Sequence, residues 1–189
     1  MAGLSRLALR RRAGRWLALA LLAWGGVAAA QAQPSVENQV KAAYLFKFAG
    51  FVEWPEGSFA RADSPLQIGV AGNEGLADQL EQMVAGRTVG GHAVMVRKLR
   101  RGDAVAGIHI LFIGAGERAA VIDMLAAARG QSVLTVSDAD DGIALGCMIA
   151  FVVAQDRLRF DVALGQVNSS RLRISARMLA AANRVQGVT

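Results

Sequence analysis

The chain has 189 residues, a formal net charge of +6 and a hydrophobic fraction of 53%. Five of its 21 basic residues are arginines between positions 6 and 15, and no acidic residue accompanies them there. Without the first 32 residues, 16 basic and 15 acidic residues remain, a net charge of about +1. Because nucleic-acid binding needs a retained basic face, this balance argues against that class of protein.

The first 32 residues have the layout of a secretory signal peptide. A basic stretch (6–15) precedes an apolar run (16–27), and small residues around Ala30 and Ala32 provide cleavage sites. The apolar run is shorter than the about 20 residues that a transmembrane helix needs, which disfavours the alternative of an uncleaved anchor. We therefore expect a periplasmic protein, secreted across the inner membrane and cleaved near Ala30 or Ala32.

Residues 33–189 are expected to form a single domain, since this length suffices to bury a core. Export permits disulfide bonds, but Cys147 is the only cysteine and cannot form an internal bridge. Its apolar surroundings in the sequence (147–153) favour a buried, inert thiol over a reactive one.

The elements alternate between helix and strand along the chain. Helical periodicity predicts helices over residues 35–52, from Asn73 to about Val84, over 117–129 and over 176–184, and apolar runs predict strands over 66–71, 94–96, 109–113, 132–136, 148–153 and 158–162. Pro55 is expected to stop the first helix at Trp54, and Ser175 to cap the last. The pattern predicts an α/β three-layer sandwich, a mostly parallel sheet of about six strands flanked by helices. The polar turn 154–157 predicts a C-terminal antiparallel hairpin.

Residues 114–119 (Gly-Ala-Gly-Glu-Arg-Ala) have the G-x-G-x-x-A spacing of a dinucleotide-binding turn. They follow a predicted strand and open a predicted helix, and Asp138 lies about 20 residues further on. Against this, the motif lies past the middle of the domain, and Glu117 places a carboxylate where phosphates would approach. A purely structural turn is the favoured interpretation, and no cofactor is expected.

Other motifs are weak. The glycines in 69–75 have no lysine beside them for a phosphate, and 138–142 resembles a calcium loop whose glycine comes one place early. The basic cluster 97–101 is interpreted as a solvated turn. His92 and His109, the only histidines, stand in no catalytic pattern. We therefore expect no enzyme, no catalytic residue and no metal site.

Five aromatic residues crowd into 14 positions: Phe46, Phe48, Phe51, Trp54 and Phe59. Core packing of the first helix is one interpretation. The other is a partner or ligand surface, because one helix face cannot bury so many rings and exposed apolar patches usually mark interaction sites.

Residues 40–55 (Val-Lys-Ala-Ala-Tyr-Leu-Phe-Lys-Phe through Val-Glu-Trp-Pro) resemble the N-terminal signature of the YfiR family of exported proteins. The segments 134–151, 159–162 and 172–179 resemble the family's strand-turn-strand block, closing strand and closing helix. The resemblance covers nearly the whole of the chain after the signal peptide, and it depends on the order and spacing of these segments together.

The resemblance implies an α/β sandwich, a periplasmic location and no catalysis. Family members act as repressors that bind the periplasmic part of an inner-membrane diguanylate cyclase and lower cyclic-di-GMP. The family's ligand contacts would fall near Glu53, Trp54, Arg173 and Ser175, although a basic residue is expected at Glu53. The chain also departs from the family in having a single cysteine, so redox control through a bridge is not expected.

Together these observations predict a periplasmic regulatory protein that binds and represses an inner-membrane signalling protein, either a diguanylate cyclase or a sensor kinase. A periplasmic small-molecule sensor or binding protein is the alternative. A homodimer is plausible, because aromatic residues are in excess, and no membrane embedding is expected after cleavage. The predicted partner- or ligand-binding residues are Phe46, Phe51, Glu53, Trp54, Phe59, Arg173 and Ser175.

Overall fold

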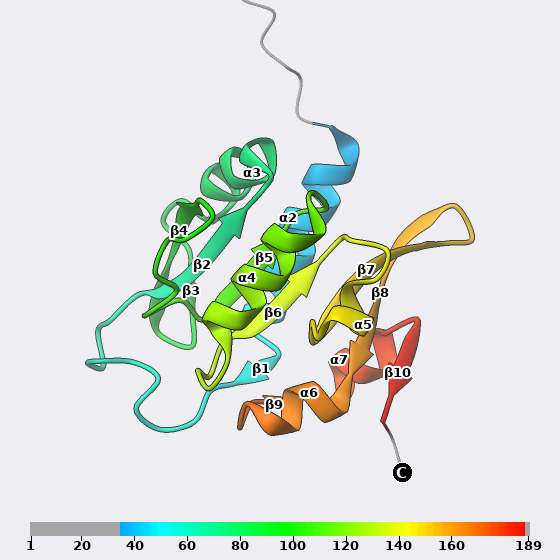
Figure 1. The fold of residues 1–189 in the computed structure, drawn as a ribbon. Helices are drawn as coiled ribbons and strands as arrows, with labels where there is room; N and C mark the ends of the chain where they lie inside the picture. Colours follow the sequence, from blue (N-terminus) through cyan, green and yellow to red (C-terminus); the bar gives the residue numbers. More distant parts are fainter. Residues whose placement is uncertain (1–34, 188–189) are drawn as a thin grey trace, which may run out of the picture. The chain divides into compact units, whose positions relative to one another are not determined.

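A twisted sheet with helices on both faces dominates the computed structural model, which describes residues 35–187 (Figure 1). In chain order the elements are α2 (Val36–Ala49), β1 (Val52–Glu53), β2 (Leu66–Ala71), α3 (Glu74–Val84), β3 (Thr88–Val89), β4 (His92–Leu99), β5 (Ile110–Ile113), α4 (Arg118–Ala128), β6 (Leu134–Ser137), α5 (Gly142–Leu145), β7 (Ile149–Ala154), β8 (Arg157–Ala163), α6 (Leu164–Ser169), β9 (Arg173–Ile174), α7 (Ala176–Ala181) and β10 (Arg184–Gln186). The predicted signal peptide lies outside the described residues. No helix within 35–187 is long and apolar enough to cross a membrane.

The main sheet has eight strands in the order β10-β8-β7-β6-β5-β2-β4-β3. Its centre from β4 to β7 is parallel, β7 and β8 form an antiparallel hairpin, and β10 runs parallel to β8. The predicted fold class and hairpin are confirmed. The sheet is wider than predicted because β3 and β10 are short edge strands without the apolar runs that reveal buried strands.

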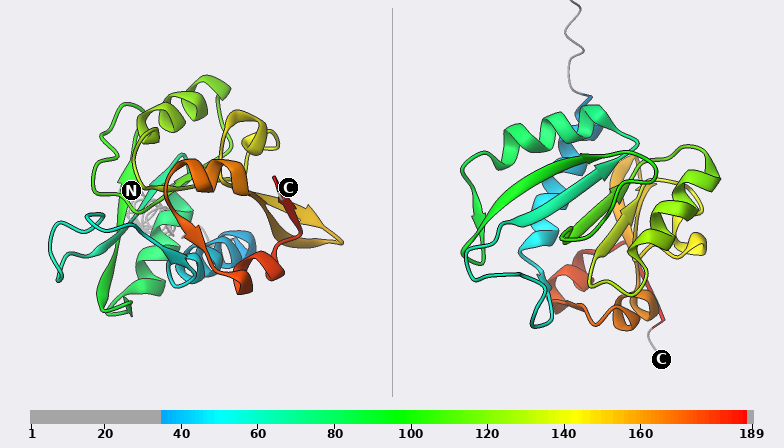
Figure 2. Two further views of the ribbon diagram at one scale, coloured as in Figure 1. Left: turned by 90° about the horizontal axis from the view of Figure 1, so that it is seen from below. Right: turned by 60° about the vertical axis from the view of Figure 1, so that its left-hand side comes forward.

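Helices cover both faces of the sheet, as the three-layer prediction requires (Figure 2). Successive residues of β5 point to opposite faces: Ile110 and Phe112 join the core under α2 and α3, whereas Leu111 and Ile113 join the core under α4. Because every residue of β5 is buried, this strand is apolar throughout rather than alternating.

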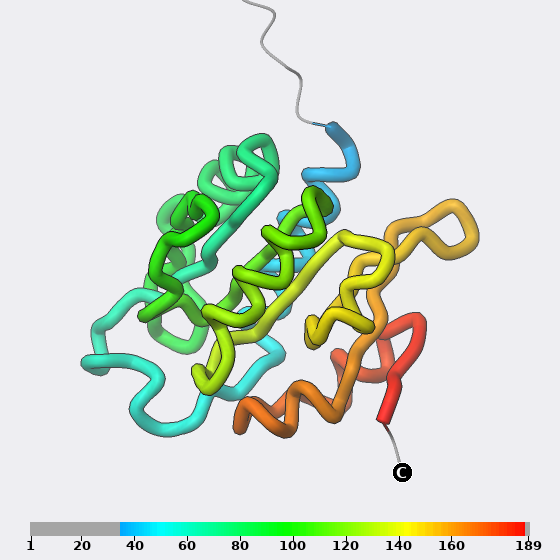
Figure 3. The backbone as a smooth tube through the Cα atoms, viewed as in Figure 1, coloured from blue at the N-terminus to red at the C-terminus, as the bar shows by residue number. Residues whose placement is uncertain are grey.

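The turn of the β7–β8 hairpin is a tight two-residue connection. Ala154 pairs with Arg157, and Gln155 and Asp156 between them have φ angles of 54° and 55°. Two consecutive positive φ angles are typical of the type I′ turn, whose twist matches that of the flanking strands. Figure 3 shows the hairpin extending beyond the neighbouring strands.

Two predicted helices are shorter than expected. The first ends at Ala49, because Gly50 closes the last turn by donating to the carbonyl groups of Lys47 and Phe48, and the chain then extends as β1. Pro55 is therefore not its stop signal. The last helix ends at Ala181, and the next residues form the parallel edge strand β10.

The side chain of Lys41 anchors α2 to the sheet. Its ammonium group is buried and lies 2.5 Å from both Asp138 Oδ2 and Glu37 Oε1. Burial alone would lower the pKa of Lys41, but the hydrogen bonds and charges of Asp138 and Glu37 outweigh it and raise the pKa. Asp138 Oδ1 also accepts the N–H of Ala115, so one carboxylate connects α2, β6 and the turn after β5.

The strand order β4-β2-β5-β6 means that the direction of winding reverses between β2 and β5. At the carboxyl ends of these strands the two turns touch: Gly114 N–H donates to Ala71 O at 2.8 Å. A Cβ atom added at Gly114 would lie 2.8 Å from Gly72 O, a backbone atom that cannot move freely. The first glycine of the G-x-G-x-x-A motif is therefore required by close packing of two turns.

We predict that Gly114→Ala lowers the free energy of unfolding by about 1–3 kcal/mol, the usual cost of forcing extra atoms into a packed site. Gly116→Ala is the matched control, because its Cβ would meet nothing closer than 3.9 Å, and its effect should stay within about 0.5 kcal/mol. Urea denaturation of both variants measures the difference. Equal effects at the two positions would contradict the packing explanation.

Candidate functional site

Four of the predicted site residues meet at a second, two-stranded sheet formed by β1 and β9. Glu53 pairs with Arg173, and Ser175 N–H donates to Phe51 O at 2.9 Å. These residues are about 120 positions apart in sequence, yet β1 and β9 lie side by side (Figure 1). The structure thus brings together the N-terminal and C-terminal segments of the predicted site.

The side chains at this small sheet differ in whether they are free to contact a ligand or a partner. Glu53 and Arg173 are exposed and face each other as opposite charges across the strand pair. Ser175 Oγ accepts from Met178 N–H at 3.3 Å and so caps α7, as its sequence position predicts. Its hydroxyl group therefore has a structural role already.

Trp54 directly follows β1 and belongs to an aromatic cluster, defined here as Trp54, Phe59, His92 and His109. Phe59 is stacked between the imidazole rings of His92 and His109, with ring centroids 3.8 Å and 4.2 Å away. Trp54 packs edge-on against Phe59 and His109, and its indole N–H donates to His109 O at 3.3 Å. The cluster holds the loop between β1 and β2 against the amino ends of β2 and β5.

The hydrogen bonds of His109 define its protonation state. Its Nδ1 accepts the N–H of Gln67 at 3.1 Å, and its Nε2 lies 3.2 Å from Ser58 O, which requires an N–H at Nε2. The ring is therefore neutral. Burial lowers the pKa of His109, the bond to Ser58 O opposes that shift, and the nearby His92 adds to it.

Sequence reasoning gave these two histidines no role. They are 17 positions apart in the chain and lie on different strands, so no local pattern connects them with Trp54. Only the pairing of β2 with both β4 and β5 brings His92 and His109 to either side of Phe59.

Phe46 lies apart from the other predicted site residues. Its ring is covered by the guanidinium group of Arg87, which lies 5.3 Å from the ring centroid. Phe48 is buried in the core, where its ring contacts Tyr44, Phe151 and Phe160. The core interpretation is confirmed for Phe48. Phe51, Trp54 and Phe59 are partly buried against the same core, and their role in a partner or ligand surface stays a prediction.

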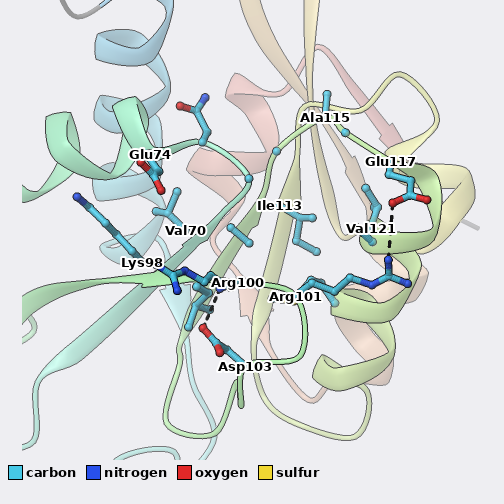
Figure 4. Close-up of a pocket in the computed structure, with 18 residues that line it drawn as sticks. Val70, Glu74, Lys98, Arg100, Arg101, Asp103, Ile113, Ala115, Glu117 and Val121 are labelled. Carbon is cyan, nitrogen blue, oxygen red and sulfur yellow. Dashed lines mark hydrogen bonds and ion pairs between the residues drawn. The ribbon is translucent and has the colours of Figure 1, made fainter. Parts of the chain in front are cut away.

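The G-x-G-x-x-A turn borders a cavity of about 670 Å³ at the carboxyl ends of β2, β4 and β5 (Figure 4). Asp138, which would hold a ribose in a dinucleotide site, already bonds Lys41 Nζ and Ala115 N–H. A dinucleotide would have to break these contacts, which favours the structural interpretation of the motif.

Two of the three carboxylates of the acidic turn 138–142 are likewise engaged. Asp138 pairs with Lys41, and Asp141 pairs with Arg118. Within residues 35–187, no group of three or more His, Cys, Asp or Glu side chains is placed to hold a metal ion.

Comparison with known families matches residues 38–183 to the YfiR/HmsC-like family. The match spans most of the chain and includes every residue of the β1–β9 sheet and of the aromatic cluster. The chain belongs to the YfiR/HmsC-like family. This is a regulatory rather than a catalytic family, and it confirms the resemblance found in the sequence. No curated protein matches the chain.

The single cysteine of this YfiR/HmsC-like protein is fully buried in the core under α4. Burial raises the pKa of the Cys147 thiol to about 12, although a hydrogen bond involving Ser137 opposes the shift. Because the thiolate is the reactive form, the thiol is inert near neutral pH. This agrees with the interpretation from its apolar sequence context.

We predict that acid destabilises the protein through His109. Because its folded-state pKa lies below the ordinary value of 6.5, its neutral form stabilises the fold fully above that pH, and this contribution is lost as pH falls towards the folded pKa. Urea denaturation measures the free energy of unfolding at about pH 7.5 and at about pH 5. Between these two pH values the free energy should fall more for the natural protein than for His109→Gln. Equal losses would contradict the assignment of His109 as the acid-sensitive group.

Proposed function

We propose that this protein is a periplasmic regulator that binds an inner-membrane signalling protein and holds its output low, with a diguanylate cyclase as the partner. The observation that carries the proposal is the match to the YfiR/HmsC-like family over residues 38–183. The resemblance of the N-terminal signature to repressors of such cyclases supplies the partner class. A sensor kinase in place of the cyclase would change the output and leave the binding role intact.

The surface best suited to the partner is the β1–β9 sheet with the adjoining side chain of Trp54. It presents a half-exposed tryptophan, a half-exposed Phe51 and the exposed Arg173, and aromatic residues and arginine are enriched at the energetic centres of protein interfaces. Glu53 beside Arg173 gives the surface a local charge pattern that a partner can match.

Repression requires that the regulator bind the inactive arrangement of its partner more tightly than the active one. Each tenfold shift of the partner towards inactivity needs about 1.4 kcal/mol of difference in binding free energy between the two states. A single well-packed tryptophan or arginine contact is worth that much, so a small surface suffices.

We expect deletion of the gene to raise cellular cyclic-di-GMP, because the restraint on the cyclase is removed. Mass spectrometry of nucleotide extracts measures the level, and return of the gene should restore it. An unchanged level in the deletion strain would contradict the cyclase as partner.

Exchanging the charges of Glu53 and Arg173 tests partner recognition separately from folding. Glu53→Arg or Arg173→Glu alone places like charges opposite each other, which costs about 0.2–1 kcal/mol of stability. The double variant Glu53→Arg, Arg173→Glu restores the opposite-charge pair but inverts its direction. We expect it to keep its thermal stability and fail to repress; full repression by the double variant would remove this surface from the interface.

A small-molecule sensor is the second candidate, because Trp54 is half-exposed near an exposed arginine on β9. A ring would stack on the indole and an anionic group would bind Arg173. Thermal unfolding in the presence of aromatic and nucleotide metabolites tests this, since a ligand specific to the folded state raises the melting temperature. Loss of the shift in Arg173→Ala would assign it to this site, and no shift with any compound would contradict a sensor.

A further inference from the structure

The cavity at the carboxyl ends of β2, β4 and β5 has no part in the proposed partner surface. It lies where the winding of the sheet reverses, the position at which open α/β sheets hold their ligands. The aromatic cluster lies at the amino ends of β2 and β5, so the two features occupy opposite ends of the same strands.

The cavity exists because the crossover from β4 to β5 contains no helix. The connecting segment 100–109 runs over β2 as a loop, and its Val105 and Ile108 are buried on the face that α4 also covers. Gly69 makes room for Leu99 and for this loop, since a Cβ there would lie 2.7 Å from Leu99 and 3.3 Å from Ile108. The segment begins at the cavity with Arg100 and Asp103 and then runs towards the amino end of β5, so no helix of this crossover covers the carboxyl ends of the strands.

The floor of the cavity is apolar. Side chains from three strands and one helix, all on the face that α4 covers, form it: Ala71, Leu99, Ile113, Val121 and Met124. A surface of this kind suits a flat hydrophobic group, and ligand sites generally combine an apolar lining with a few polar groups that fix orientation.

Arg100 is the basic group of the rim that is free to bind an anion. Lys98 pairs with Asp78, and Arg101 pairs with Asp123 and Glu117. No ion pair joins the guanidinium group of Arg100 to any described residue. Only its backbone is engaged, because its N–H donates to Asp103 Oδ2 and its carbonyl group accepts the N–H of Asp103. Figure 4 shows Arg100 at the mouth of the cavity, between Lys98 and Arg101.

The opposite rim is the turn that leads into α4. No side chain caps this helix, and the N–H groups of Gly116 and Glu117 make no hydrogen bond with any described residue. Three carboxylates also lie on the rim, those of Glu74 and Glu117 and that of Asp103 beside Arg100, and they would repel a ligand carrying several negative charges. The lining therefore matches one anionic group, not a pyrophosphate.

We propose that this cavity binds a small ring compound that carries a single carboxylate or phosphate group. The ring lies on the floor formed by Leu99, Ile113 and Val121, and the anionic group accepts hydrogen bonds from Arg100 and from the uncapped start of α4. A ligand here is independent of the partner surface at β1–β9.

Titration of the ¹⁵N-labelled protein with phenyl phosphate, benzoate, inorganic phosphate and benzyl alcohol tests the proposal. Phenyl phosphate or benzoate should give saturable shifts at the amides of Gly116 and Glu117, and the tighter of the two identifies the anionic group. Inorganic phosphate, which has no ring, and benzyl alcohol, which has no charge, should bind at least about tenfold more weakly, since each lacks one of the two contacts. Inorganic phosphate binding as tightly as phenyl phosphate would overturn the proposal.

Arg100→Gln should weaken binding about tenfold, the loss expected for one charge-assisted hydrogen bond. Ala120→Leu, which fills the cavity without changing any charge, should abolish binding of the ring compounds. The control is Arg184→Gln, an exposed arginine on the edge strand β10. Equal affinity in all three variants, or shifts centred on Trp54 and Arg173, would overturn the proposal without bearing on the partner surface.

Discussion

The contact between the turns after β2 and β5 is the constraint on which the rest of the structure depends. Gly114 lies against the carbonyl group of Gly72, and a side chain at Gly114 would separate the two strands at the point where the winding reverses. From this point α3 and α4 leave on opposite faces of the sheet. Next to Gly114, the N–H of Ala115 donates to Asp138, which also bonds Lys41 Nζ, so the turn after β5 is connected to α2 as well. A motif that resembles a cofactor site is explained by packing.

The strands β2 and β5 carry different chemistry at their two ends. At the amino ends, His109 bonds Gln67 N–H and stacks on Phe59, which orders the loop beside Trp54. At the carboxyl ends, the loop crossover from β4 leaves a cavity with an apolar floor and an unpaired arginine on its rim. Apart from Gln67, every residue of these two strands is buried. On the two proposals above, the strands separate the ligand from the partner, so the two would bind independently. Coupling between the ends would require that the strands or the β1–β2 loop have two arrangements.

Packing, rather than covalent cross-linking, holds the described fold together. With one buried cysteine and no internal bridge, its stability depends on two apolar cores, one on each face of the sheet. Each strand of the β1–β9 sheet is only two residues long, and few hydrogen bonds hold the pair together. Its exposed charged side chains therefore have little effect on the stability of the fold. Such a surface can be adjusted to a particular partner without affecting the main sheet.

Local patterns in the sequence predict the fold class, the order of the buried elements and the β7–β8 hairpin, because apolar periodicity, turn residues and caps such as Asn73 and Ser175 act over a few positions. The family is indicated separately, by the order and spacing of the resembling segments. The edge strands β3 and β10 and the pair β1–β9 escaped prediction, since they are too short to show a period and exist only through their partners. The same limit hid the stacking of His92 and His109 on Phe59 and the cavity beside Arg100. Those features depend on strand order and on a crossover that lacks a helix, and long-range pairing of this kind is decided only when the chain packs as a whole.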